Sequence, residues 1–177
     1  GDTENWPQYR GARSDGLGEG ATLPETWSPT ENVVWKTAVP GWGWSSPIVL
    51  GGRIFLTSAV GEKPLPTPHV GGYPGGHLGT EETHRWMLYC LDFETGKILW
   101  EFEAHKGIPP QMRHPRNSFA SETPVTDGER VYAYFANIGV FCCDMDGRKL
   151  WERRWPSYPM RDGWNTGTSP VLHDGRI

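Results

Sequence analysis

The chain has 177 residues, with 17 basic against 21 acidic side chains, and this length suits one domain. The near balance of charge, with no basic stripe, argues against a nucleic-acid partner and against attraction to an anionic membrane surface. No run of about 18 apolar residues occurs, so no membrane span is expected. Ten tryptophans beside 23 glycines and 16 prolines favour an all-β chain with many turns over a disordered one, which would lack that much apolar surface to bury.

The N-terminal part precedes the repeats described next. Residues 1–31 are predicted to form an extended segment. Residues 32–39 contain Val33, Val34 and Trp35, and they resemble the tail of a repeat whose front is missing. We therefore predict a short strand at residues 32–39.

Two sequence units recur along the rest of the chain. The first unit reads Ser/Thr-Pro, a β-branched residue, a glycine-bearing turn, an Arg six residues after the Pro, and then Ile or Val. The second unit places a Gly four residues before a Trp. Such self-similarity is the signature of a repeat architecture. The first unit occurs at residues 46–54, 123–131 and 169–177, and the second at residues 90–101 and 142–152.

Together the two units predict four short antiparallel strands per repeat. The Pro opens the first strand, where a missing N–H is harmless, and a glycine turn leads to a second strand that begins at Arg53 or Arg130. The third strand is predicted to end at Asp92 or Asp144, and a tight hairpin follows because Gly accepts a positive φ. The fourth strand is predicted to end at the Trp.

The repeat length is typical of the blade of a β-propeller. Pro124 and Pro170 are 46 residues apart, and a propeller blade takes about 40–50 residues. We predict that the strand at 32–39 completes the last blade of the intact ring, so that residues 32–177 form a partial propeller. The other blades are predicted at residues 45–104 and 121–155, with the start of a third at residues 168–177.

The first blade contains an insertion, predicted as a long loop at residues 61–84. Loops of this length are usually functional or disordered. A metal site could be drawn from the acidic and imidazole side chains in the loop, but their spacing matches no standard ligand pattern. We therefore favour a solvated loop and predict no metal. The side chains concerned are His69, His77, His84, Glu81 and Glu82.

At the second unit the sequence resembles the PQQ-like β-propeller repeat family of the quinoprotein alcohol dehydrogenase-like superfamily, most closely at residues 92–100. Residues 5–11, Asn-Trp-Pro-Gln-Tyr-Arg-Gly, resemble the start of secreted, uncharacterised bacterial members, and the resemblance runs to the end of the chain. It implies a fragment of a β-propeller, eight-bladed when intact, with four-stranded antiparallel blades. It also implies a periplasmic or secreted location, although the chain begins at Gly1 with no visible signal peptide.

The resemblance further implies a tryptophan-docking motif, in which an indole of one blade locks against the neighbouring blade. Such a ring can bury roughly 150–250 Å², and a Gly in the turn leaves space for it to lie flat. The residues predicted to have this structural docking role are Trp35, Gly96, Trp100, Gly147 and Trp151.

The adjacent Cys142 and Cys143 raise the alternative of a vicinal disulfide, which some PQQ dehydrogenases carry against the cofactor. The repeat register argues against it, because Cys142 aligns with Cys90 and Cys143 with Leu91, within the third strand. Adjacent strand residues point to opposite faces of a sheet, which strains a ring between them. We predict that these cysteines pack as small apolar residues.

The connections before each Ser/Thr-Pro are the better candidates for a binding site. They lead from an outer strand to the next inner strand and therefore border the central channel of a propeller, where ligands usually sit. Polar and aromatic residues there suit either ligand binding or a hydrated turn. The candidate channel-facing residues are Trp44, Ser45, Asn117, Ser118, Glu122, Asn165 and Thr168.

The chain contains no nucleophile motif, P-loop or dinucleotide fingerprint, and no catalytic residue is predicted. The first hypothesis is an exported, non-catalytic binding or scaffold module without a cofactor, with a protein partner or small ligand at the propeller face. The alternative is a PQQ- and calcium-dependent dehydrogenase of alcohols or sugars. The resemblance implies that such an enzyme holds calcium with Glu and Asn ligands beside a catalytic Asp, and Glu122 is the acidic residue in the connections where a calcium ligand would be expected.

Overall fold

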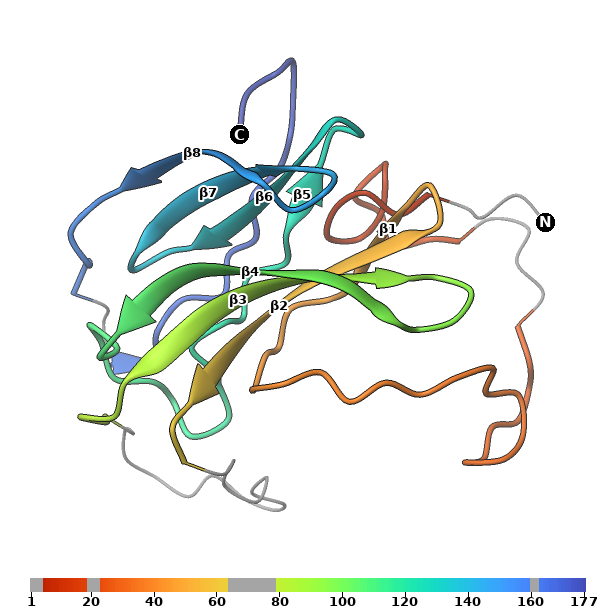
Figure 1. Ribbon diagram of the computed structural model, residues 1–177, viewed down its shortest axis with the longest axis horizontal. Coiled ribbons are helices and arrows are strands. Elements are labelled where there is room, and N and C mark those ends of the chain that lie inside the picture. The colour runs from red at the N-terminus through yellow and green to blue at the C-terminus, as the bar shows by residue number, and fades with distance from the viewer. Residues whose placement is uncertain (1–4, 19–22, 64–78, 160–162) are drawn as a thin grey trace.

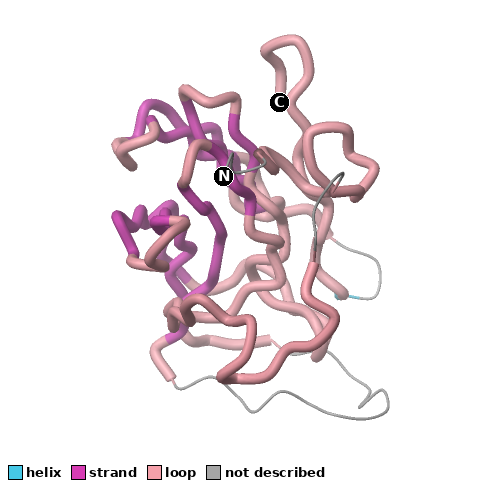
Figure 2. Tube along the Cα trace, turned by 90° about the vertical axis from the view of Figure 1, so that its right-hand side faces the viewer, coloured by secondary structure: helices cyan, strands magenta, loops and turns pink. Residues whose placement is uncertain are grey.

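The computed structural model describes residues 5–18, 23–63, 79–159 and 163–177. Within these ranges the chain forms eight β-strands and no α-helix. The strands make two four-stranded antiparallel sheets, each in sequence order (Figure 1). Figure 2 shows the strands gathered in two layers on one side, with much of the loop structure on the other. The fold is therefore all-β, as predicted, and is a fragment of a β-propeller.

The two sheets correspond to the two blades predicted from the repeats. In both sheets the third strand ends at the predicted Asp, so the predicted end of this strand is confirmed. The first blade comprises β1 (Ile48–Leu50), β2 (Arg53–Gly61), β3 (His84–Asp92) and β4 (Ile98–Gly107). The second comprises β5 (Val125–Thr126), β6 (Arg130–Phe135), β7 (Gly139–Asp144) and β8 (Lys149–Arg154).

The fourth strands differ from the prediction, because the tryptophan lies near their start and not at their end. Trp100 is the third residue of β4, and Trp151 is the third residue of β8. The strands continue past the indole because the long third strand still offers pairing partners, up to the pair His84–Gly107 in the first blade. Each indole therefore lies close to the hairpin turn that opens its strand.

The hairpins between the third and fourth strands depend on glycine. Gly96 and Gly147 have φ angles of 68° and 84°, a region that other residues enter only with strain. In the first hairpin the carboxylate of Asp92 also accepts hydrogen bonds from the N–H and hydroxyl of Thr95, at 2.8 and 2.6 Å. The turns are thereby fixed in shape, and an indole packs against each of the two glycines.

The core lies between the two sheets. One cluster of buried side chains joins Phe55 and Leu88 of the first blade to Val131 and Phe141 of the second. Cys143 belongs to the same cluster. Much of the stability of this fragment therefore comes from the contact between blades, since burial of apolar area is the dominant favourable term in folding.

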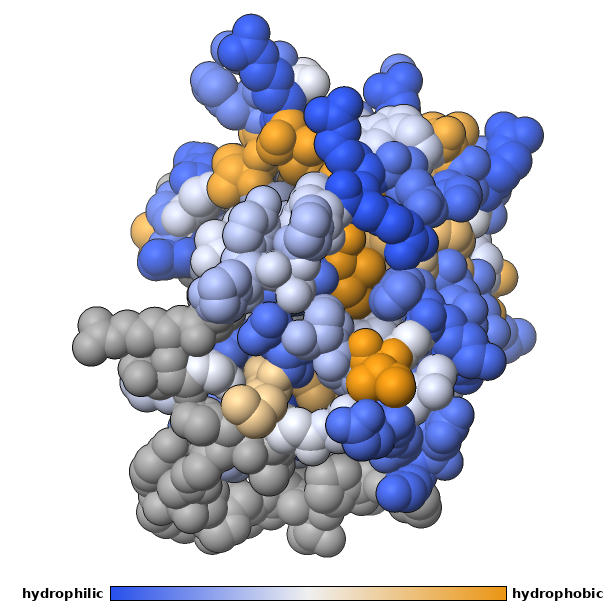
Figure 3. Space-filling view, turned by 90° about the vertical axis from the view of Figure 1, so that its left-hand side faces the viewer, coloured by the Kyte–Doolittle hydropathy of each residue, from blue (hydrophilic) through white to orange (hydrophobic). Residues whose placement is uncertain are grey.

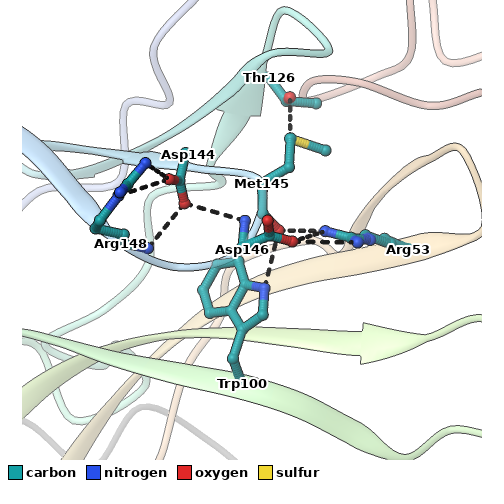
Figure 4. A network of polar contacts seen from close by, with 7 residues as sticks. All are labelled: Arg53, Trp100, Thr126, Asp144, Met145, Asp146 and Arg148. Atoms are coloured by element: carbon teal, nitrogen blue, oxygen red, sulfur yellow. Dashed lines mark hydrogen bonds and ion pairs between the residues drawn. The ribbon is translucent and has the colours of Figure 1, made fainter.

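An indole and a glycine turn form the polar contact between the blades (Figure 4). The Nε1–H of Trp100 donates to the carbonyl oxygen of Met145 at 3.0 Å, and a Cβ added to Gly147 would lie 2.6 Å from the Trp100 ring. The guanidinium of Arg53 donates to the same Met145 carbonyl and lies 3.4 Å from Oδ1 of Asp146. The β7–β8 turn is therefore held by two side chains of the first blade.

The same geometry occurs once more at the other side of the first blade. The Nε1–H of Trp35 donates to the carbonyl oxygen of Phe93 at 2.8 Å, and its ring covers Gly96 so closely that a Cβ there would overlap it. Trp151, the equivalent residue of the second blade, is 40% exposed and lies beside Tyr132. The Trp–Gly contact is thus present at both glycine turns, Gly96 and Gly147, that the sequence repeat contains.

A second repeated link joins the Ser/Thr-Pro motifs. The backbone N–H of Ser46 donates to Oγ1 of Thr123 at 2.9 Å, and the N–H of Thr123 donates to Oγ of Ser169 at 3.0 Å. Each of these two hydroxyls therefore satisfies a backbone donor of the preceding repeat, which explains why Thr or Ser occupies this position in the second and third copies.

The N-terminal segment differs from the extended form expected for it. Trp6 makes an antiparallel bridge to Val49 of β1, with N–H···O distances of 2.7 and 2.9 Å, and Pro7 accepts a hydrogen bond from Thr126 of β5 at 3.0 Å. The chain then turns back under the Trp6 ring at Gly11, whose φ is 80°. The segment thereby joins the inner strands of both blades.

Two predicted strands are not paired in the structure. Residues 33–39 belong to no sheet, and the predicted start of a third blade contains only the turn in which His173 and Arg176 bond each other at 2.9 Å. A strand needs a partner to form a ladder, and the described residues supply none for either segment. Their places in further blades, and the number of blades, stay predictions.

We expect Trp100→Ala to lower the free energy of unfolding by about 3–5 kcal/mol, because it leaves a cavity between the blades and removes one of the two donors to the Met145 carbonyl. Trp44→Ala is the control, because Trp44 is 54% exposed and its removal should cost less than about 1 kcal/mol. Denaturant unfolding of both variants measures the difference. Equal losses would show that the indole does not hold the blades together.

We expect Thr123→Val to cost about 1 kcal/mol, since it leaves the N–H of the half-buried Ser46 without its acceptor. Thr123→Ser keeps the hydroxyl and should cost less. Hydrogen exchange of the Ser46 amide, compared between the two variants, measures the effect directly. Protection in the Val variant as strong as in the Ser variant would contradict this role of the hydroxyl.

Candidate functional site

The blade connections and the turns between second and third strands share one end of the molecule, because the strands are antiparallel. Figure 1 shows β4 and β8 both finishing at this end, away from the N-terminal segment beside β1. The connection at residues 108–124 and the one after Arg154 therefore start side by side. We call this the connection end.

Asn117 joins two successive connections. Its Nδ2 donates to the carbonyl oxygen of Trp164 at 3.0 Å, and its Oδ1 accepts from the N–H of Ser118 at 2.9 Å and from the hydroxyl of Ser121. Ser118 is buried, and its hydroxyl accepts from the N–H of Ala120 at 3.1 Å. These two predicted candidates are therefore engaged in holding the backbone of the connections.

Glu122 is a buried carboxylate, 3% exposed. Its Oε1 accepts from the hydroxyl of Thr166 and from the N–H of Ala136 at 3.3 Å. Its Oε2 accepts from the N–H of Ser121 at 3.2 Å. Burial raises the pKa of Glu122 above its usual range, and these donors oppose the shift only in part.

Asn165 lies beside Glu122 but bonds a residue that the sequence did not single out. Its Oδ1 accepts from Nδ2 of Asn137 at 2.7 Å and from the N–H of Thr166 at 2.9 Å. Asn165 has a positive φ of 62°, a conformation that Asn tolerates better than most residues. The structure therefore brings Asn117, Glu122 and Asn165 into neighbouring positions.

Trp44 belongs to a row of side chains that crosses three connections. The Trp44 and Trp42 rings are 6.5 Å apart, and Cζ of Arg113 lies 4.8 Å from the centroid of Trp42. His114, next in the chain, has its ring 5.9 Å from that of Trp164. We call these five residues the aromatic array; its two ends, Trp44 and Trp164, are 54% and 55% exposed.

The centre of the aromatic array is held rigidly. Arg113 is buried, and its Nη1 donates to the carbonyl oxygen of Asn117 at 2.8 Å and to two further carbonyls of the same turn at 3.4 Å. Its guanidinium also lies 5.5 Å from the ring of Phe119. A cation between two rings gains cation–π attraction, which is stronger where water is excluded.

The other predicted candidates lie apart from this cluster. Ser45 exchanges hydrogen bonds with the backbone of Thr57, both at 3.0 Å, so it fixes the entry to the first blade. Thr168 is exposed and lines a separate hollow of about 650 Å³ beside Trp151 and Tyr134.

The three cysteines are free thiols, and all are fully buried in β3 or β7. Burial raises the pKa of Cys142 to about 11 and that of Cys143 and Cys90 to about 12. A thiol with so high a pKa is a poor nucleophile and metal ligand. The cysteines pack as apolar residues, and their pattern carries no redox site in this structure.

The part of the chain that the structure describes holds no group of three or more His, Cys, Asp or Glu side chains able to bind a metal ion. The loop predicted at residues 61–84 is shorter than expected, because Gly61 ends β2 and His84 begins β3, where the two residues pair. The ring of His84 bonds the carbonyl of Glu82 at 2.9 Å. His69 and His77 lie outside the described residues. Nor do the described ranges include a helix long and apolar enough to cross a membrane.

The sequence did not indicate Asn137 and Arg113 as site residues. The candidates it offered lie directly before each Ser/Thr-Pro, whereas Asn137 lies in the β6–β7 turn and Arg113 lies earlier in the connection. The strand order contained the signal for Asn137, since in an antiparallel blade that turn must lie at the same end as the connections. No sequence pattern marked Arg113.

Two four-stranded antiparallel blades, linked by a Trp–Gly contact that repeats with the sequence, define a segment of a repeat-built β-propeller. The family model described as outer membrane protein assembly factor BamB matches residues 62–177, which is more than half of the chain. The chain therefore belongs to this family of PQQ-like β-propeller repeats. A comparison with curated proteins finds no match.

The raised pKa of Glu122 predicts a pH dependence of stability. Because the folded protein binds this proton more tightly than the unfolded chain, stability is greatest below the ordinary pKa of 4.5 and is lost as pH rises through the raised folded value. We expect the free energy of unfolding to fall with pH in this window more steeply for the native protein than for Glu122→Gln. Parallel pH profiles would show that the carboxyl does not titrate abnormally.

Proposed function

We propose that the protein is an exported, non-catalytic binding or scaffold module that holds a protein partner at its connection end. The observation that carries this proposal is the aromatic array, which crosses three connections and leaves Trp44 and Trp164 half exposed. Trp and Arg are the residues most enriched among those that dominate binding energy at protein interfaces.

The array suits binding because it is preorganised. Arg113 is fixed by three carbonyls and packs against Trp42, while Asn117 fixes the backbone at Trp164. Side chains that are already ordered lose little conformational entropy on binding, so more of the contact energy appears as affinity.

The surroundings of the array resemble a reversible interface more than a permanent one. Figure 3 shows the side of the molecule at which β4 and β8 finish, and hydrophobic side chains reach the surface there as separate spots among hydrophilic ones. Non-obligate interfaces have this mixed composition, whereas permanent ones are more uniformly apolar. A partner that binds and leaves is therefore favoured.

The dehydrogenase alternative fits the residues less well. Both oxygens of Glu122 face N–H or O–H donors, whereas calcium takes six to eight oxygen ligands whose lone pairs point at the ion. The cavity beside Glu122 measures about 10 Å³, too small for such a shell.

The location of the protein is part of the proposal. The matched family is described as an outer membrane protein assembly factor, which supports the periplasm as the compartment and a protein as the partner. We also propose that Trp35, Trp100 and Trp151 act alike as docking residues, so that Trp151 receives the glycine turn of a further blade in the intact ring.

Photo-crosslinking in the cell envelope tests the proposal. The full-length protein would carry p-benzoylphenylalanine in place of Trp44 or, separately, of Trp164. We expect both positions to crosslink to the same protein, because the array spans the distance between them. Mass spectrometry of the crosslinked band identifies the partner.

The matched control places the same probe at Trp27, which is 59% exposed and lies outside the array. Crosslinks from all three positions alike, or from none, would contradict binding at the connection end. Oxidation of alcohols or sugars by the full-length protein with added PQQ and calcium would contradict the non-catalytic assignment.

A further inference from the structure

The amide of Asn165 has only one possible orientation. The backbone N–H of Thr166 points at Oδ1 of Asn165 from 2.9 Å, and a backbone N–H can only donate. The atom that faces it must therefore be the oxygen, since an NH₂ group there would place hydrogen against hydrogen. The orientation of Asn165 is fixed by a group that cannot itself be reversed.

Asn137 is oriented in turn by Asn165. Its amide lies 2.7 Å from Oδ1 of Asn165, so Asn137 must present Nδ2, a donor, to that oxygen. Its own Oδ1 consequently points the other way. That oxygen is buried and is the one buried side-chain atom in the described ranges for which no hydrogen-bond partner is present.

A cavity of about 10 Å³ lies beside Asn137. Its lining combines polar side chains, among them Gln111, Glu122 and Thr166, with the aromatic rings of Trp86 and Phe135. A space of this size admits about one water molecule, and a buried water usually needs two to four polar partners. The cavity supplies both conditions next to an acceptor that lacks a donor.

We infer that this cavity is a binding site for one buried water molecule, which donates a hydrogen bond to Oδ1 of Asn137. Leaving that oxygen unpaired would cost roughly the desolvation of an amide carbonyl, so a bound donor is the more stable state. Glu122 and Thr166 line the same cavity as Asn137. The water would therefore join the hydrogen-bonded cluster around the Glu122 carboxyl.

A metal cation suits the cavity less well than water. The carboxylate oxygens of Glu122 already accept from Ala136 and Ser121, so a cation would have to lie close to N–H hydrogens of like polarity. Water needs no such rearrangement, because it can donate to Asn137 and accept from a neighbouring amide or hydroxyl.

The water has a structural consequence for the connection end. Asn137 belongs to the β6–β7 turn, and Asn165 and Thr166 follow Trp164 in the connection. The water thus joins the group of contacts that ties this turn to the segment carrying Trp164. The inference does not depend on which partner binds there.

A crystal structure of the full-length protein, at a resolution that shows ordered waters, tests the inference. We expect a peak at hydrogen-bond distance from Oδ1 of Asn137, about 2.6–3.2 Å away. We expect the peak to be absent from Asn137→Leu, which keeps the approximate volume of the side chain and removes the acceptor. A peak that persists in the Leu variant would show that Asn137 does not hold the water.

Two other outcomes would also overturn the inference. The first is an empty cavity in the native protein, with Oδ1 of Asn137 turned to a protein donor. The second is an anomalous signal at the site after soaking in rubidium chloride, which would identify a cation. Should Asn137→Leu fail to fold, the native crystal with and without rubidium still decides between water, cation and an empty space.

Discussion

The contact between the Trp100 indole and the β7–β8 turn is the interaction on which the rest of the structure depends. The indole ring lies against Gly147, where no Cβ fits. Its Nε1–H donates a hydrogen bond to the Met145 carbonyl oxygen of the same turn. Arg53, on β2 of the same blade, donates to the same carbonyl. Apolar burial and hydrogen bonding thus occur at one place, and they hold the β7–β8 turn of the second blade against the first.

The strand order places this contact and the candidate binding site at opposite ends of the blades. The indoles and glycine turns lie at one end, and the antiparallel strands bring the connections to the other, where Arg113, Asn117 and Glu122 organise them. The buried polar groups there satisfy one another across successive connections. These contacts hold the backbone of the connections rigid. The half-exposed tryptophans are therefore kept in fixed positions, as interface anchors require.

The repeats in the sequence predicted the two blades and their turns but misplaced the ends of the fourth strands, and the contacts that do not repeat were missed. Gly96, Gly147 and the strand ends at Asp92 and Asp144 followed from spacing, because a tight turn restricts the residue at each place. The pairing of Asn137 with Asn165 could not be predicted, since it joins side chains 28 residues apart whose meeting depends on tertiary packing. The folded N-terminal segment was missed because its hydrogen bonds go to other strands and follow no local period.

The claim that the blades are held by a mutually dependent Trp–Gly contact is tested most directly by a double-mutant cycle on Trp100→Ala and Gly147→Ala, measured as free energies of unfolding of the full-length protein. The account predicts strong coupling of about 1–3 kcal/mol, because the added Cβ at Gly147 collides with the indole only while the indole is present, and the remaining cost is the strain of the positive φ. Additive losses within about 0.5 kcal/mol would contradict the account, since they would show that the ring and the turn contribute to stability independently.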